Sequence, residues 1–374
     1  MFSLPAWIAT VICTAAADVS PGVIVDEVKG YALYLPSSYT QDRAWPVIFA
    51  FDPRGRGRTP VERYQAAAEK YGYIVAGSNV SRNGSWQVSM QAAQDMVADV
   101  GGRFRLDPKR VYAAGMSGGA RVAMGIALQQ ELIAGVIASS AGYPDDKPPR
   151  KSLRFVVFGT AGTEDFNYRE MWELDRALAT PHRVVFFEGG HVWLSSDLAV
   201  EAVEWIELQA MAAGRTGRNE KWIQEQYAVR TLAASKLSGA RAVLALEGIA
   251  ADFAAFRNVD EVKSLAAAMR KEKTVRDEFK RREAEVENER RKTAEVLQLE
   301  RQLNAPDARA LALQQLQRAW KELAEEAAAE QDSPARRVAR RVSRNLAMSV
   351  SERTTDPDYQ KLVAPFAPRF RQGN

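Results

Sequence analysis

The chain is poor in the residue types on which several classes of protein depend. Its 374 residues include one cysteine, Cys13, and two histidines, His182 and His191. One thiol cannot form an internal disulfide, and so few cysteines and histidines exclude a thiolate zinc site. No apolar run, the first one included, is long enough to cross a bilayer. A phosphate-binding loop and a cluster of metal ligands are also missing, so we expect no cofactor and no metal.

The excess of positive charge is small. Lysine and arginine total 51 and aspartate and glutamate 47, which gives a formal net charge of +4. A nucleic-acid-binding protein gathers its basic residues on one face, together with a recognisable motif. The arginines of residues 336–344 have neither interleaved aromatics nor such a motif. We therefore expect no nucleic-acid partner.

The first residues resemble an export signal. Leu4–Cys13 is a short apolar run, and Ala15-Ala16-Ala17 fits the small-residue pattern of a cleavage site. No lysine or arginine precedes the run, which is unusual for a signal, and the alternative is a segment buried in the fold. We interpret residues 1–17 as a signal peptide and expect a secreted or periplasmic protein without Cys13.

Residues 18–213 have the pattern of an α/β domain. Short runs of β-branched and aromatic residues alternate with amphipathic stretches long enough for crossover helices. Most runs are continuously apolar, as expected of strands buried on both faces of a largely parallel sheet. The predicted strands are Tyr31–Leu35, Val47–Phe51, Tyr73–Gly77, Val111–Ala114, Gly135–Ser139, Phe155–Phe158 and Val184–Phe187.

Residues 214–374 have a different composition, rich in Ala, Leu, Glu, Lys, Arg and Gln, which favours helices. Between Arg270 and Lys292 the apolar stripe thins to Val275, Phe279 and Val286 among dense charges. This pattern is typical of a long exposed helix or a weak coiled coil. We predict an all-α accessory domain, through which the chain could self-associate or bind a protein partner.

A candidate nucleophile stands in Gly115-Met116-Ser117-Gly118-Gly119, which matches G-x-S-x-G. A predicted strand precedes the motif and an amphipathic helix follows it, as a nucleophile elbow requires. The glycines leave room for a strained turn, and the Gly118 N–H at the start of the helix can donate to an oxyanion. We predict Ser117 as nucleophile and Gly118 as an oxyanion donor; the alternative is a turn that only packs strand on helix.

A serine nucleophile needs a base, and the chain offers only two histidines. His191 follows the last predicted strand, on the side of the sheet where open α/β folds place their active sites. His182 opens that strand and is better explained as a residue at the sheet edge. We therefore predict His191 as the base.

The predicted acid is Asp165, which follows the strand Phe155–Phe158. Glu164 is its rival, and a solvated loop carboxylate is the structural alternative. The chain order Ser117, Asp165, His191 is the order found in α/β-hydrolases.

These motifs together resemble the α/β-hydrolase superfamily from Gly30 to Ala213, and most of all its secreted bacterial esterases of the polyhydroxybutyrate depolymerase and feruloyl esterase type. The likeness is carried by Gly115–Gly119 with its preceding strand, by Gly162–Asp165, and by Gly190-His191-Val192-Trp193. The resemblance implies an α/β-hydrolase fold, an acyl-enzyme mechanism, and a small or polymer-linked ester as substrate.

One departure from these relatives concerns the second oxyanion donor. Where many of them carry His-Gly after the third strand, this chain has Phe51-Asp52-Pro53-Arg54-Gly55. Pro53 has no N–H to donate. The backbone N–H of Arg54 is therefore the predicted second donor.

Three residues are candidates for the substrate pocket: Trp86, Trp193 and Arg121. Core packing is the alternative for the tryptophans, and an ion pair within the fold for the arginine. Farther along, an arginine-rich helical face could rest on an anionic membrane, although a solvated face of a packed helix explains it better. That face consists of Arg336, Arg337, Arg340, Arg341 and Arg344.

The sequence thus predicts a serine-dependent carboxylic ester hydrolase with a helical accessory domain. One alternative is a peptidase or amidase that uses the same residues. Another is a weakly active or inactive hydrolase-fold scaffold whose helices bind a partner. An enzyme with an accessory domain should still hydrolyse small esters without residues 215–374, whereas a scaffold should lose its partner.

Overall fold

The computed structural model describes residues 19–27, 29–144 and 150–366. The predicted signal peptide lies outside these residues. The described chain forms two compact units, and the expected boundary at residue 213 falls close to the one observed after Asn219. Two loops of the α/β half nevertheless belong to the second unit. That unit comprises Ala161–Trp172, Phe186–His191 and the chain from Glu220 onward, and the remainder forms the first unit.

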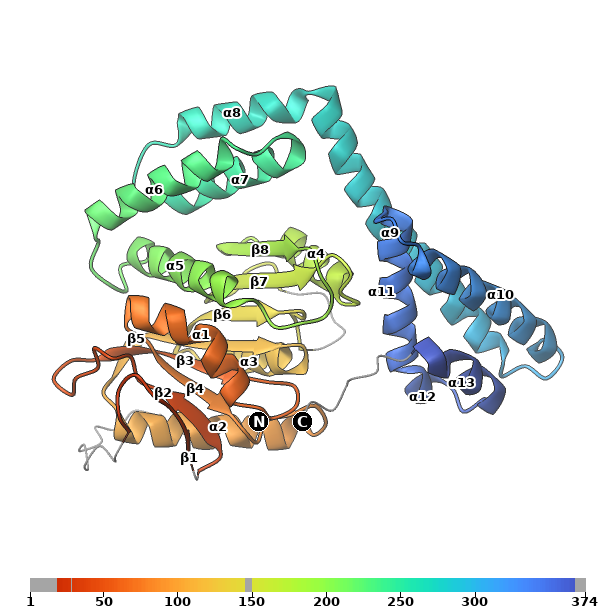
Figure 1. The fold of residues 1–374 in the computed structure, drawn as a ribbon, viewed down its shortest axis with the longest axis horizontal. Coiled ribbons are helices and arrows are strands. Elements are labelled where there is room, and N and C mark those ends of the chain that lie inside the picture. Colours follow the sequence, from red (N-terminus) through yellow and green to blue (C-terminus); the bar gives the residue numbers. More distant parts are fainter. Residues whose placement is uncertain (1–18, 28, 145–149, 367–374) are drawn as a thin grey trace. The chain divides into compact units, whose positions relative to one another are not determined.

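An eight-stranded sheet forms the centre of the first unit (Figure 1), in the order β1-β2-β4-β3-β5-β6-β7-β8. Strand β2 pairs antiparallel with β1 and β4, while β4, β3, β5, β6 and β7 pair in parallel. All seven predicted strands are present, and β1 is an addition. The strands are β1 (Ile24–Glu27), β2 (Tyr31–Tyr34), β3 (Trp45–Phe51), β4 (Ile74–Ser78), β5 (Leu106–Met116), β6 (Ile133–Ser139), β7 (Val156–Gly162) and β8 (His182–Phe187).

Helices cover both faces of this sheet, which explains why its central strands are continuously apolar. Every residue of β2, β3, β4 and β6 is buried. Helices α1 (Arg58–Tyr71) and α5 (Ser196–Ala212) pack together on one face, and α2 (Trp86–Arg103) and α3 (Gly118–Gln129) on the other (Figure 1). The chain has an α/β-hydrolase fold, as predicted.

The second unit is helical, as the composition of residues 214–374 predicts. Its α9 is one helix of 30 residues that packs on α7, α8, α10 and α11. Val275 and Val286 of the thin apolar stripe are buried, so the stripe serves packing within the unit. The elements are α6 (Glu220–Ala234), α7 (Gly239–Phe253), α8 (Asp260–Lys271), α9 (Lys273–Gln302), α10 (Arg309–Ala328), α11 (Pro334–Met348), α12 (Val350–Arg353), α13 (Pro357–Val363) and η1 (Ala364–Phe366). Helix α4 (Tyr168–Ala177) belongs partly to each unit.

The end of the helical unit has its own apolar core. Side chains of α10, α11 and α13 meet there around Trp320, which is fully buried, and the Trp320 indole N–H donates to the Tyr359 hydroxyl at 3.0 Å. This core fixes α11 on its neighbours, so the polar face of α11 is held in a defined orientation.

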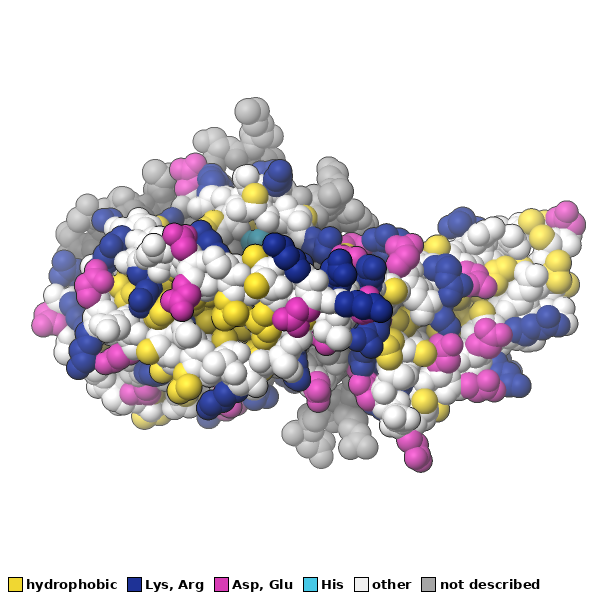
Figure 2. All heavy atoms as spheres, turned by 90° about the horizontal axis from the view of Figure 1, so that it is seen from above, with side chains coloured by type: hydrophobic (Ala, Val, Ile, Leu, Met, Phe, Trp, Pro, Cys, Tyr) yellow, Lys and Arg dark blue, Asp and Glu magenta, His cyan; other side chains and the backbone are white. Residues whose placement is uncertain are grey.

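Helices α6 to α8 expose several apolar side chains, among them Val229, Leu232 and Leu265. Figure 2 shows apolar side chains gathered on the surface over these helices. Within the described part of the chain, no helix is both long enough and apolar enough to span a membrane.

Candidate active site

Ser117 occupies a strained turn between β5 and α3. Its φ of 55° and ψ of −124° lie in a region that residues with a side chain rarely adopt. The residue is the N-cap of α3, yet its side chain makes no capping hydrogen bond. No capping hydrogen bond compensates for this strained backbone conformation. The turn therefore leaves the Ser117 hydroxyl available for another role, as in a nucleophile elbow.

The turn closes only because two glycines of the motif lack side chains. A Cβ on Gly115 would lie 2.2 Å from the Gly119 carbonyl oxygen, and a Cβ on Gly119 would lie 1.9 Å from that of Phe51. These approaches place the start of α3 directly on β3 and β5. The N–H of Gly118 thereby lies at the positive end of the helix, next to Ser117, as predicted for an oxyanion donor.

The N–H of Arg54 is already engaged, contrary to the prediction that it serves as the second donor. It donates to Asp52 Oδ1 at 2.9 Å, two residues back along the chain. Asp52 is fully buried and also accepts two hydrogen bonds of 3.0 Å from the Arg56 guanidinium and one of 2.8 Å from the Trp193 indole. The Asp52 carboxylate therefore holds the loop after β3 in a conformation in which the Arg54 N–H is already hydrogen-bonded.

Asn83, which no sequence motif singles out, lies against the elbow instead. A Cβ on Gly118 would come within 1.9 Å of Asn83 Oδ1, so the Asn83 amide sits directly over Gly118. The Asn83 N–H donates to the Pro53 carbonyl at 2.8 Å, and Arg54 and Arg82 form a β-bridge beside it. Among the described residues the Asn83 side-chain amide has no hydrogen-bond partner. Its nitrogen lies 3.6 Å from the same Cβ position on Gly118, farther than its oxygen.

Asp165 and His191 form a hydrogen-bonded pair. His191 Nδ1 lies 2.8 Å from Asp165 Oδ1, which also accepts the Asn167 N–H at 2.8 Å. Asp165 is fully buried, and Phe166 stacks on the imidazole with 3.9 Å between ring centroids. A carboxylate on Nδ1 fixes the tautomer in which Nε2 can accept a proton. The structure thus brings together the two residues predicted as acid and base.

Close backbone packing brings the loops of this pair together. The Thr163 N–H donates to the Phe187 carbonyl and the Glu164 N–H to the Gly189 carbonyl, each at 2.8 Å. A Cβ on Gly162 would lie 2.3 Å from the Gly189 oxygen and 2.4 Å from the Gly190 oxygen. Only glycine permits that approach, which explains the glycines around both predicted residues.

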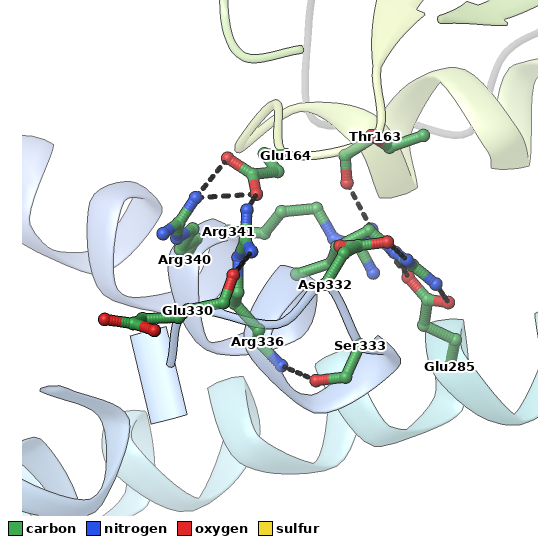
Figure 3. Close-up of polar contacts among 10 residues, drawn as sticks. Thr163, Glu164, Glu285, Glu330, Asp332, Ser333, Arg336, Arg340 and Arg341 are labelled. Atoms are coloured by element: carbon green, nitrogen blue, oxygen red, sulfur yellow. Dashed lines mark hydrogen bonds and ion pairs between the residues drawn. The ribbon is translucent and has the colours of Figure 1, made fainter. Parts of the chain in front are cut away.

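Glu164, the rival acid, has a different role. Its carboxylate accepts hydrogen bonds from Arg340 at 2.7 and 2.8 Å and from Arg336 at 3.0 Å (Figure 3). Burial alone would raise the pKa of Glu164, but the hydrogen bonds from Arg340 and Arg336 hold this pKa below its usual value. Glu164 therefore anchors the acid loop to α11.

Arg341 makes the second attachment between α11 and this loop. Its Nη1 donates to the Thr163 carbonyl at 2.7 Å, and its side chain is fully buried (Figure 3). The charge is balanced by Glu285 at 2.9 Å and Glu289 at 2.7 Å, both on α9. Burial raises the pKa of Glu289 even with Arg341 beside it.

Asn345, one turn farther along α11, adds a 3.3 Å hydrogen bond to the Phe166 carbonyl. The loop that carries Asp165 is thus fastened to α11 on both sides of the acid.

His182, the other histidine, is fully engaged elsewhere. Its two ring nitrogens each lie 2.7 Å from a backbone carbonyl oxygen, those of Thr180 and Asp175. This is the structural role expected for it, and it leaves no ring nitrogen free to accept a proton from a nucleophile.

The three predicted pocket residues lie in different segments of the first unit. The Trp86 ring lies against Gly125, where a Cβ would be 2.3 Å from it, about 12 Å along α3 from Ser117. Trp193 is buried and bonded to Asp52. Arg121 is partly buried in the first turn of α3 and has polar partners of its own. Core packing, the alternative for the tryptophans, fits Trp193, whereas Trp86 keeps 41% of its surface exposed. A role of the three residues in a substrate pocket stays a prediction. The described residues contain no cluster of side chains able to hold a metal ion.

No family model matches the chain, and no curated protein matches it. Similar solved structures cover about half of it. A Bacillus cereus carboxylesterase is 18% identical over 47% of this chain and 92% of its own, with a TM-score of 0.38. A feruloyl esterase module from Clostridium thermocellum is 14% identical over 52% and 93%, with a TM-score of 0.39. A puromycin-hydrolyzing peptidase of Mycobacterium tuberculosis is 12% identical over 48% of this chain, which spans 36% of that peptidase; its TM-score is 0.38.

Proposed function

We propose that the chain is a serine-dependent carboxylic ester hydrolase, with Ser117 as nucleophile, His191 as base and Asp165 as acid. The observation that carries the proposal is the 2.8 Å hydrogen bond between buried Asp165 and His191, in the loops that follow β7 and β8. A strained serine follows β5 in the same sheet, with an N–H at the start of a helix beside it. The proposed nucleophile, acid and base thus follow three strands in the order used by α/β-hydrolases.

Contacts within the first unit support a base near the elbow. Val192 and Trp193, the residues directly after His191, are tied down there: the Ser140 hydroxyl donates to the Val192 carbonyl at 3.0 Å, and the Trp193 indole to Asp52. Ser140 and Asp52 follow β6 and β3, the two neighbours of β5. These two contacts hold the residues that directly follow His191 against the loops after β6 and β3.

The proposed reaction is acyl transfer. His191 Nε2 removes the proton of the Ser117 hydroxyl as its oxygen attacks the ester carbonyl, and the imidazolium then protonates the departing alcohol. Asp165 stabilises that imidazolium without taking up its proton. Water, deprotonated by the same imidazole, releases the acid from Ser117. The substrate we propose is a small or polymer-linked ester, as for the esterases that the motifs resemble, and the predicted export signal would place the reaction outside the cytoplasm.

Labelling with a fluorophosphonate probe tests this function, because the probe reacts only with an activated serine. The wild-type chain should be labelled, with the adduct mapping to the peptide that contains Ser117. Ser117→Ala should remain folded and unlabelled. A folded wild type that stays unlabelled, or an adduct on another serine, would contradict the proposal and favour the inactive scaffold.

The second oxyanion donor in this mechanism is the side-chain amide of Asn83. Asn83→Ala should lower kcat about 100-fold with little change in KM, because the lost donor acts on charge that develops only in the transition state. The measurement is steady-state hydrolysis of 4-nitrophenyl acetate.

Ser85→Ala provides the matched control from the same loop. Ser85 caps α2 by accepting the Val88 N–H, so its loss should cost about 1 kcal/mol of stability while kcat stays unchanged. Wild-type kcat in Asn83→Ala would exclude Asn83 from the oxyanion site.

A further inference from the structure

Helix α11 carries five arginines on one face, and four of them are neutralised. Each of the four forms an ion pair with a carboxylate of the same unit, at 2.5 to 3.0 Å. These residues are Arg336, Arg337, Arg340 and Arg341. These four residues make up most of the arginine-rich face of α11. Their ion pairs indicate that this part of the face serves packing within the unit.

The fifth, Arg344, has no such partner. Among the described residues it takes part in no hydrogen bond and no ion pair, although it is partly buried. Its Nη1 lies 3.7 Å from the position of a Cβ on Gly190, the residue before His191. An unpaired guanidinium therefore stands beside the proposed base.

The position of this guanidinium is fixed by its neighbours. Arg340 and Arg341 precede it by one turn and fasten α11 to the acid loop through Glu164 and Thr163. Asn345 follows it and bonds to the Phe166 carbonyl, next to the ring that stacks on His191. Arg344 is thus held in place by packing, as a residue that recognises a ligand must be.

A partly buried cation without a counterion attracts an oxyanion. The guanidinium presents a planar fork of donors that matches a carboxylate, and such charge-assisted bonds are stronger than neutral ones. The absence of a side chain on Gly190 leaves space for a ligand group to reach this fork.

We propose that Arg344 binds a carboxylate on the substrate, so that the enzyme prefers esters whose acyl part carries a second, free carboxyl group. This inference rests on the proposed esterase function. It makes Arg344 a specificity residue, and it separates Arg344 from the four arginines that serve the fold.

The test compares two aryl esters of equal chain length, 4-nitrophenyl butyrate and the 4-nitrophenyl half-ester of succinic acid. The wild type should prefer the half-ester in kcat/KM. Arg344→Gln should lose about 10- to 100-fold on the half-ester, the usual size of a hydrogen-bonded charge, and keep its rate on the butyrate. The control is Arg318→Gln, which removes the same charge from an exposed position of α10 and should change neither rate. Arg318 forms no ion pair among the described residues.

The outcomes separate this inference from the function on which it rests. A wild type that labels with fluorophosphonate but shows no preference, or an Arg344→Gln variant that loses both rates equally, overturns the carboxylate site and leaves the esterase intact. If neither labelling nor hydrolysis occurs, the esterase proposal fails. In that case, binding of succinate tests the carboxylate site by itself. The measurement is the rise in melting temperature that succinate causes in the wild type and in Arg344→Gln. Equal rises in the two proteins would overturn the site.

Discussion

Replacing His191 with alanine should lower kcat for ester hydrolysis roughly 10⁴- to 10⁶-fold, the range seen when the base of such a nucleophile is removed. The imidazole is the group proposed to take the proton of Ser117, and Asp165 holds it by Nδ1 with 2.8 Å between the two atoms. Without it, the serine hydroxyl is a weak nucleophile at neutral pH. Initial rates with 4-nitrophenyl acetate measure the loss, and circular dichroism confirms that the variant is folded.

His182→Gln is the matched control, because it removes the chain's only other histidine. Both ring nitrogens of His182 contact backbone carbonyls at 2.7 Å. The change should therefore cost about 1 kcal/mol of stability for a lost hydrogen bond, with kcat within about twofold of the wild type. Equal losses of activity in the two variants, or an active His191→Ala, would contradict the assignment of His191 as base.

The sequence predicts the sheet and the elbow because both depend on local pattern. Continuous β-branched runs identify strands buried on two faces, and G-x-S-x-G between a strand and a helix identifies the corner at Ser117. The pairing of Asp165 with His191 also follows, because each stands in the first loop after a strand and only two histidines exist. In each case a few residues that are neighbours in the sequence are enough to predict the feature.

Asn83, the proposed second oxyanion donor, could not be predicted in the same way. Asp52 accepts the N–H two residues ahead, a turn that aspartate commonly forms, and this signal argues against Arg54 as a free donor. The contact of Asn83 with Gly118 joins loops more than 30 residues apart. Only the packed sheet brings these loops together, so no local pattern could reveal the contact.

The role of α11 was hidden for a similar reason. The spacing of its arginines along the sequence shows that they share one face of the helix. The carboxylates that pair with them, however, are distant in sequence: Glu164 is 176 residues from Arg340, and Glu289 is 52 residues from Arg341. Composition alone therefore suggested an accessory domain. The hydrogen bonds instead make α11 part of the support of the acid loop.

Removal of residues 220–374 should consequently abolish ester hydrolysis, with kcat reduced at least about 10³-fold. This outcome differs from the one expected of an enzyme with an independent accessory domain. Without α11, the Thr163 carbonyl loses Arg341 and the Glu164 carboxylate loses both Arg336 and Arg340. Asp165 lies next to these anchors, and an acid that no longer holds His191 in place leaves the nucleophile without its base. Hydrolysis of 4-nitrophenyl acetate by the two chains, at matched concentrations of folded protein, measures the loss.

A substitution in the full chain distinguishes lost support from a fold that collapses on truncation. Glu164→Gln keeps the shape of the side chain but removes the charge that pairs with Arg336 and Arg340. It should lower kcat about tenfold with KM unchanged, while Ser117 is still labelled by fluorophosphonate at a reduced rate. The exposed pair Arg270–Glu247, on α8 and α7, supplies the control: Glu247→Gln also breaks an ion pair of 2.8 Å in the helical unit and should leave kcat unaltered. If the truncated chain hydrolyses esters as fast as the full chain, the arginines of α11 serve only the stability of the helices. If Glu164→Gln slows the reaction and Glu247→Gln does not, the contact between α11 and the loop of Asp165 contributes to kcat. The helical half is then part of the catalytic machinery.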